Sequence, residues 1–182
     1  MRPVRSTPGM SLRSLVAACV LMLLLTAACS QSPGKASARP TPSFIATTGG
    51  CAGTVLTNSE PPLWAQGGWT HTNGTPWPVP WTAAASGQAV AFVFAGRLVA
   101  GPSPRVDGSS NKVLWVLRDP VQFVVEGRPS GESTPVVTIP GGPSIVDVPT
   151  PGCWTFRLIP SNHPEQVSTI SLDVLPHGAT PN

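Results

Sequence analysis

Proline and glycine are spread so densely along this chain that they exclude a helical domain. The 182 residues include 23 prolines and 18 glycines. Proline removes a helical hydrogen bond, and glycine costs about 1 kcal/mol in a helix interior. After Ser30, the only stretches of helical length that lack both residues already favour strands. The chain beyond that point is therefore predicted to be all-β.

Short runs rich in valine, isoleucine, threonine and aromatic residues lie between these breakers, as strands do. The predicted strands are residues 88–95, 112–118, 121–126, 135–139, 144–148, 153–159 and 167–174. In the last run, Thr169 and Asp173 alternate with Ile170 and Leu172, which is typical of a strand with one buried face. Turn signals such as Asp107-Gly108 separate the runs. This spacing predicts one immunoglobulin-like β-sandwich over residues 51–177, followed by a disordered tail at 178–182.

The first 29 residues have the pattern of a secretory signal, with a cationic start, an apolar core and small residues at the end. The pattern consists of Arg2, Arg5 and Arg13, the apolar run 15–25, and Thr26-Ala27-Ala28. The apolar run is shorter than the roughly 20 residues of a membrane-spanning helix.

Cys29 directly follows these small residues, and the arrangement resembles the lipobox of bacterial lipoproteins. In that family, the cut falls before the cysteine, whose thiol carries diacylglycerol. The resemblance implies a cleaved signal peptide over residues 1–28, lipidation of Cys29 and attachment to the extracytoplasmic face of a bacterial cell membrane. The alternative is an ordinary cleaved signal with an incidental cysteine.

Residues 29–50 are rich in serine, proline, threonine, alanine and glycine, and Lys35 and Arg39 are their only charges. Such a segment cannot bury a core, so it is predicted to be a flexible tether between the lipid and the domain. An edge strand is the alternative only for its later residues, around 43–46.

The charge balance of the processed chain excludes nucleic acid as a partner. Removal of Arg2, Arg5 and Arg13 from the 11 basic residues leaves as many basic as acidic residues, of which there are 8. A nucleic-acid-binding domain needs a basic face. We expect a monomer whose partners are the membrane, through the lipid, and another envelope protein or a wall glycan.

The cysteines predict one disulfide bond. Cys19 leaves with the signal and Cys29 carries the lipid, so Cys51 and Cys153 remain in an oxidising compartment. Their bridge would close a loop of about 100 residues, worth roughly 4.7 kcal/mol in the chain-entropy model. The alternatives are two free buried thiols or half of a metal site. The 3 histidines of the chain are isolated, so no metal site and no cofactor is predicted.

A second resemblance begins at Pro149-Thr150-Pro151-Gly152-Cys153-Trp154. Together with an early cysteine and a central Leu114-Trp115-Val116 strand, this pattern resembles many small secreted or lipid-anchored bacterial proteins of undefined function. The resemblance supports the disulfide and the sandwich but carries no catalytic or binding residue. At this corner, Cys153 is expected to point into the core and Trp154 to the other face or across the rim. The bridge to Cys51 would tie the first strand to a late one and close the sandwich across its two sheets.

The segment 61–81 is the most distinctive candidate for a binding surface, since it holds Trp64, Trp69, Trp77 and Trp81 among prolines. Four indoles on a stiff loop could form an aromatic platform for a cell-wall glycan, because sugars present apolar C–H faces to indole rings. The alternative is that the loop folds over one open end of the sandwich and its indoles plug the core.

The remaining candidates are weaker. Arg97, Arg105, Lys112 and Arg118 form either a small cationic patch for an anionic ligand or scattered solvated charges. Catalytic sets can be assembled on paper from Ser103, His163 and Asp147, or from the carboxylates Glu126, Asp147 and Asp173, but no spacing supports them. No catalytic residue is predicted. The sequence favours a lipid-anchored extracytoplasmic binding or accessory module; a wall-glycan-binding module is the alternative, and a small envelope hydrolase is less favoured.

Overall fold

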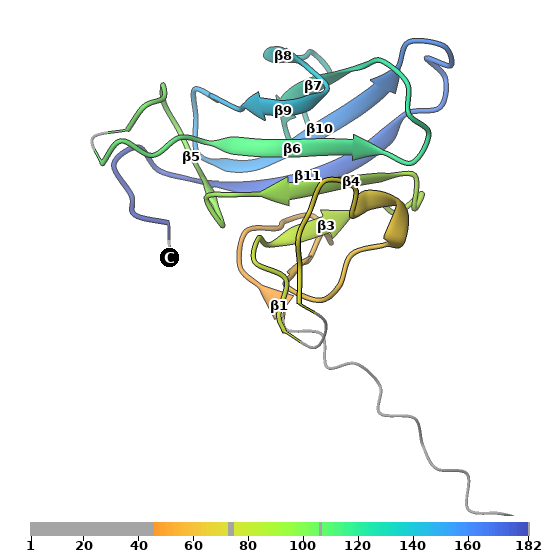
Figure 1. Ribbon diagram of the computed structural model, residues 1–182. Helices are drawn as coiled ribbons and strands as arrows, with labels where there is room; N and C mark the ends of the chain where they lie inside the picture. Colours follow the sequence, from red (N-terminus) through yellow and green to blue (C-terminus); the bar gives the residue numbers. More distant parts are fainter. Residues whose placement is uncertain (1–45, 73–74, 106, 182) are drawn as a thin grey trace, which may run out of the picture. The chain divides into compact units, whose positions relative to one another are not determined.

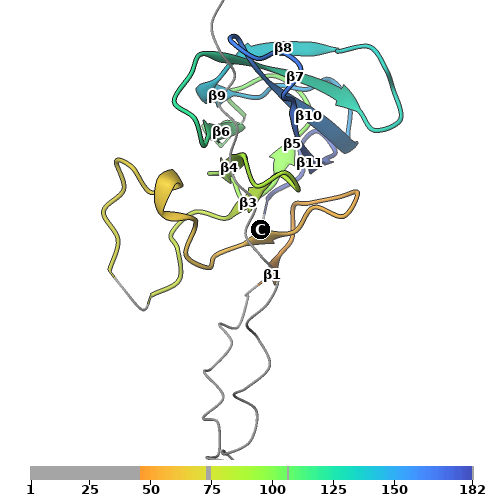
Figure 2. The ribbon, with the colours of Figure 1, turned by 90° about the vertical axis from the view of Figure 1, so that its right-hand side faces the viewer.

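The computed structural model describes residues 46–72, 75–105 and 107–181 of the chain. These residues form two stacked β-sheets, which Figures 1 and 2 show in two views turned by 90° about the vertical axis. Within this described part, the helical structure is one short 3-10 turn, η1 (Leu63–Ala65). The all-β class and the sandwich are confirmed, and the immunoglobulin-like strand order stays a prediction. The signal peptide, Cys29 and most of the tether lie outside the described residues.

The first sheet, sheet A, has six strands, and the second, sheet B, has five. In spatial order, sheet A consists of β1 (Ala46–Thr47), β2 (Leu56–Thr57), β3 (Trp81–Ala83), β4 (Ala89–Val93), β6 (Lys112–Leu117) and β9 (Gly142–Ile145). Sheet B consists of β5 (Leu98–Val99), β11 (Ser168–Leu175), β10 (Gly152–Pro160), β7 (Phe123–Pro129) and β8 (Val137–Pro140). All pairs are antiparallel except β5 with β11.

The main core lies between the two sheets and contains alternate residues of their long strands. Trp154, Phe156 and Leu158 of β10 are fully buried there, together with Ile170 and Leu172 of β11. Their neighbours along β10 are partly exposed, so this strand keeps the one-sided pattern of a sheet with one solvated face. The alternation predicted for residues 167–174 is therefore confirmed for the inward positions.

The longer predicted strands correspond to observed ones, with shifts at their ends. The run 144–148 differs most, since β9 begins earlier, at Gly142. The expected break before it is reduced to Gly141, where the chain crosses from β8 in sheet B to β9 in sheet A. A Cβ atom at Gly141 would lie 2.5 Å from the Phe123 ring, so this tight crossing requires glycine.

Residues 49–57, at the N-terminal end of the described chain, cross the sandwich on the side opposite to Gly141. Gly49 accepts a hydrogen bond from the Asp173 amide of β11, and Gly50 forms a bridge with Leu172. The chain then turns and enters sheet A as β2. Paired backbone thus begins at Ala46, before the Cys51 boundary expected for the domain.

Candidate functional site

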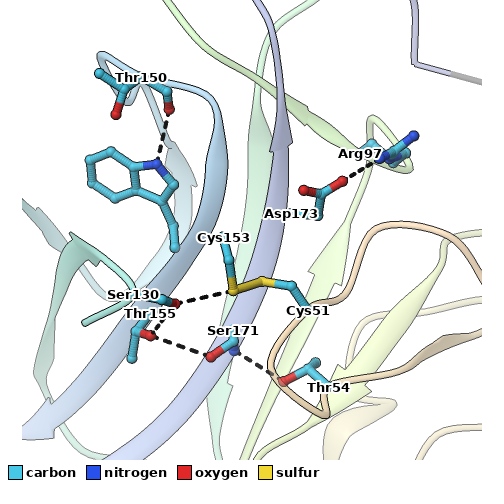
Figure 3. The surroundings of a disulfide bond; sticks show 10 residues. Cys51, Thr54, Arg97, Ser130, Thr150, Cys153, Thr155, Ser171 and Asp173 are labelled. Atoms are coloured by element: carbon cyan, nitrogen blue, oxygen red, sulfur yellow. Dashed lines mark hydrogen bonds and ion pairs between the residues drawn. A yellow bond between two sulfur atoms is a disulfide. The ribbon is translucent and has the colours of Figure 1, made fainter. Parts of the chain in front are cut away.

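The predicted Cys51–Cys153 disulfide is present, and it fixes the N-terminal crossing to sheet B (Figure 3). Cys153 lies opposite Asp173 in the β10–β11 ladder, and its neighbour Trp154 is fully buried in the core. Successive side chains of a strand point to opposite faces, so Cys153 lies on the outer face of sheet B. The expectation that Cys153 points into the core is therefore wrong, because Trp154 occupies the inward position.

The disulfide holds a tight turn against β11. The Thr54 amide donates to the Cys51 carbonyl at 2.9 Å, and the residues between them, Ala52 and Gly53, have φ of 49° and 84°. The Thr54 hydroxyl accepts a hydrogen bond from the Ser171 amide at 3.2 Å. Ser171 is only 7% exposed although it belongs to the outer face of sheet B, as expected for a residue beneath this turn.

A groove of about 650 Å³ lies beside the turn, between the start of sheet A and β11. We call it the hydroxyl groove, because its polar side chains all end in hydroxyl groups except for one indole. It is lined by Ala52, Gly53, Thr54, Val55, Thr57, Trp81, Thr82, Ala83, Ala85, Thr169 and Ser171. None of these residues is ionisable at physiological pH. β3 pairs with β2 only at Trp81, which leaves Thr82 and Ala83 at a free sheet edge in the groove.

Thr82 is the least exposed hydroxyl-bearing residue of this lining, since only 4% of its surface is accessible. Ser171 and Thr57 follow at 7% and 9%. A hydroxyl group in such a position can donate to or accept from a group that enters the groove. No sequence signal marks Thr82, because threonine is an ordinary strand residue.

The four tryptophans of segment 61–81 do not form an exposed platform. Trp77 is 2% exposed and Trp81 8% exposed, whereas Trp64 and Trp69 are partly buried. They pack with Val90 and Phe92 on the outer face of sheet A, away from the main core. The segment thus covers the face of a sheet instead of an open end, because the outward residues of β4 are apolar and require cover. Trp81 also lines the hydroxyl groove.

The four candidate cations are not gathered on one surface feature. Arg97 pairs with Asp173, and Lys112 lies over the Phe94 ring, 4.8 Å from its centroid. Arg105 donates to Asn111 and to the Ser109 hydroxyl, and it lines a second pocket of about 550 Å³ with His177. Arg118 is exposed and lines a separate shallow depression with Trp64.

That second pocket also contains Asp107, whose carboxylate accepts hydrogen bonds from the Ser109 hydroxyl at 2.6 Å and the Ser109 amide at 2.9 Å. These bonds favour the charged form and lower the pKa of Asp107 from its usual value. Because the carboxylate is fully exposed, the bonds mainly order the loop before β6.

The structure brings Ser103 and Asp147 together, but it pairs His163 and Glu126 with residues outside the candidate sets. The Ser103 hydroxyl donates directly to Asp147 at 2.7 Å, and His163 contacts Glu165 at 3.2 Å. Glu126 pairs with Arg157 at 2.9 Å. No group of three or more histidine, cysteine or acidic side chains suited to a metal ion occurs within residues 46–72, 75–105 and 107–181.

Comparison of the chain with protein-family models, curated proteins and solved structures gives no match. In the part of the chain that the structure describes, no helix has the length and apolarity needed to cross a bilayer. The site is therefore defined by its own geometry: a neutral groove beside a disulfide-held turn.

Proposed function

We propose that this protein is a lipid-anchored extracytoplasmic binding module of a bacterial envelope, whose ligand enters the hydroxyl groove. The groove is the observation that carries the binding role. It is concave, it has a volume within the roughly 300–1,000 Å³ of known ligand sites, and it is lined by several hydroxyl groups on apolar walls.

Two features support the location. The N-terminal 29 residues resemble a lipoprotein signal with its cysteine, and the two cysteines that remain after processing are joined to each other. Disulfides persist in oxidising compartments and are rare in the cytosol. A lipid at Cys29 would hold the module at the membrane, and the residues between Cys29 and Ala46 would set its reach.

Substitution of Cys29 tests the anchor. In cells that express Cys29→Ala, we expect the protein to lose the acyl mass on its N-terminal peptide and, because the signal is then not processed as a lipoprotein signal, to change its apparent size. Mass spectrometry and membrane fractionation measure both effects. Cys19→Ala is the matched control, because Cys19 lies in the discarded segment and its loss should change neither property. Native protein in the cytosol, with Cys51 and Cys153 open to alkylation, would overturn the proposal.

A further inference from the structure

We infer that the ligand of the hydroxyl groove is a neutral saccharide, held as a short segment of a glycan chain. This inference rests on the proposed binding role, and it names the chemical class that the groove accepts. It does not depend on the lipid anchor. It also moves the saccharide away from the four tryptophans as a platform, since only Trp81 among them lines the groove.

The absence of ionisable groups in the lining sets the charge of the ligand. A charged group that enters a groove without a counter-charge loses hydration and gains no ionic partner, which is costly. The nearest ion pair on the same face of sheet B, Arg97 with Asp173, is already closed on itself. The ligand is therefore uncharged where it contacts the groove.

The polar lining matches a ligand that carries hydroxyl groups. A hydroxyl group both donates and accepts, so a row of them can pair with sugar hydroxyls in several orientations. Thr54 uses its oxygen to accept from Ser171 and keeps its own proton available. Thr82 adds a further hydroxyl group in the least exposed part of the lining.

The apolar lining suits the other surface of a sugar. Val55 is 59% exposed at the groove, and Ala83 and the edge of Trp81 extend the same surface. Pyranose rings present C–H faces that pack on such surfaces while their hydroxyls point to the sides. The combination of apolar wall and hydroxyl groups fits a sugar ring.

A peptide fits this groove less well. Peptides that bind a free sheet edge add a strand, and their affinity comes from successive main-chain hydrogen bonds. The free edge of β3 is limited to Thr82 and Ala83, because β3 spans only Trp81–Ala83. This edge is too short to hold an added strand.

The test titrates the purified, detergent-solubilised full chain with three neutral trisaccharides: chitotriose, maltotriose and mannotriose. Amide chemical shifts in NMR spectra report the site and the affinity. We expect at least one trisaccharide to shift the amides of Thr54, Thr82 and Ser171. We expect Thr82→Val to weaken that binding about tenfold, which is the loss of one hydrogen bond. Its thermal midpoint should be nearly unchanged, because valine has nearly the shape of threonine.

Thr138→Val is the matched control, since Thr138 is an exposed strand threonine on β8, outside the groove. It should bind like the parent. If Thr82→Val lowers the thermal midpoint, a second variant, Ala83→Phe, tests whether the sugar binds in the groove. Ala83 is exposed, so a phenylalanine there should fill the groove without unfolding the domain. We expect this variant to abolish binding. Membrane fractionation of the cells from which the protein is purified tests the anchor separately from the groove.

Three results would overturn the inference. The first is that no trisaccharide shifts these amides up to millimolar concentration. The second is that trigalacturonic acid, an anionic sugar, binds the groove more tightly than the neutral ones. The third is that an uncharged glycine-serine hexapeptide binds there and the sugars do not; this would leave the binding role intact and reject the saccharide.

Discussion

The two outer faces of this sandwich are treated in opposite ways. On sheet A, the outward residues of the central strands are apolar, and the segment 61–81 covers them with its indoles. On sheet B, most outward residues of the long strands are polar and partly solvated, as in the ion pair of Arg157 with Glu126, although Val124 is also exposed there. Each face also holds an irregular segment. Sheet A holds its segment by burial of apolar area, and sheet B holds the turn 51–54 by a disulfide and a few hydrogen bonds.

This difference shows what a strand sequence encodes. All five residues of β4 are buried, because one set faces the main core and the other faces the indoles. The corresponding run in the sequence is continuously apolar, as in a strand with both faces covered. β11 alternates instead, because only its inner face is in the core. A continuous run in an antiparallel sandwich therefore predicts that something lies on the outer face.

The largest expected effect tests whether the indole cover acts as a second core. Trp77→Ala should lower the free energy of unfolding by about 3–5 kcal/mol, because it removes a nearly fully buried indole. Guanidinium unfolding measures this loss. Trp64→Ala is the matched control and should cost less, since Trp64 is only partly buried. Equal and small losses in both variants would mean that the cover is not a core.

The next effect tests the covalent attachment on sheet B. The double substitution Cys51→Ser and Cys153→Ser should lower the free energy of unfolding by about 2–4 kcal/mol, because the bridge spans 102 residues of sequence. Hydrogen exchange should rise first at residues 49–57, which the bridge holds to β11. Ser130→Ala is the control, because it removes the hydroxyl contacts with the Cys153 sulfur and with Thr155 but leaves the bridge intact. Faster exchange spread evenly over both sheets would contradict a local attachment.

A smaller effect is expected from the polar outer face itself. Glu126→Gln breaks the ion pair with Arg157. In this pair, the Arg157 side chain is 32% exposed and the Glu126 side chain 25% exposed. Pairs of this kind are worth about 0–1 kcal/mol, and salt weakens them further. Urea unfolding at low and high ionic strength measures the change. A loss as large as that of Trp77→Ala would remove the contrast between the faces.

The smallest effect concerns the backbone of the turn. Ala52 has a positive φ of 49°, a region that costs a residue with a Cβ about 1 kcal/mol or more. Ala52→Gly relieves this strain but adds freedom to the unfolded chain, so a net gain of about 0.5 kcal/mol is expected. Thermal unfolding measures it. Gly53→Ala should do the reverse, since Gly53 also has a positive φ.

The sequence predicts the parts of the fold that are long or chemically distinctive. The runs that correspond to β4, β6, β10 and β11 carry enough apolar residues to be recognised as strands. The disulfide could be predicted because few alternatives to a Cys51–Cys153 pair remained. Strands of two or three residues, such as β2 and β5, are set by partners far away in the chain and have no local pattern.

The candidate site could not be predicted for the same reason. Thr54, Thr82 and Ser171 come from three separate segments, and they meet only after the N-terminal crossing is fixed on β11. The four tryptophans are rare and large residues, which made them candidates for a binding surface. In the structure, their large indole rings cover the outer face of sheet A. Cys153 and Trp154 are neighbours on one strand, so only one of them can point into the core. The larger tryptophan fills the core, and Cys153 therefore points outward.

The bridge at Cys51 also decides how this domain would respond to mechanical tension. A pull transmitted through the residues ahead of Ala46 reaches Cys51 after only a short stretch of paired backbone and then passes through covalent sulfur to β10, in the middle of sheet B. If the chain is stretched between its two termini, residues 51–153 cannot lengthen while that bond is intact. The lining residues from Ala52 to Ala85 lie inside this closed loop, whereas Thr169 and Ser171 of β11 lie in the segment that carries the load, so such a pull would act between the two walls of the hydroxyl groove.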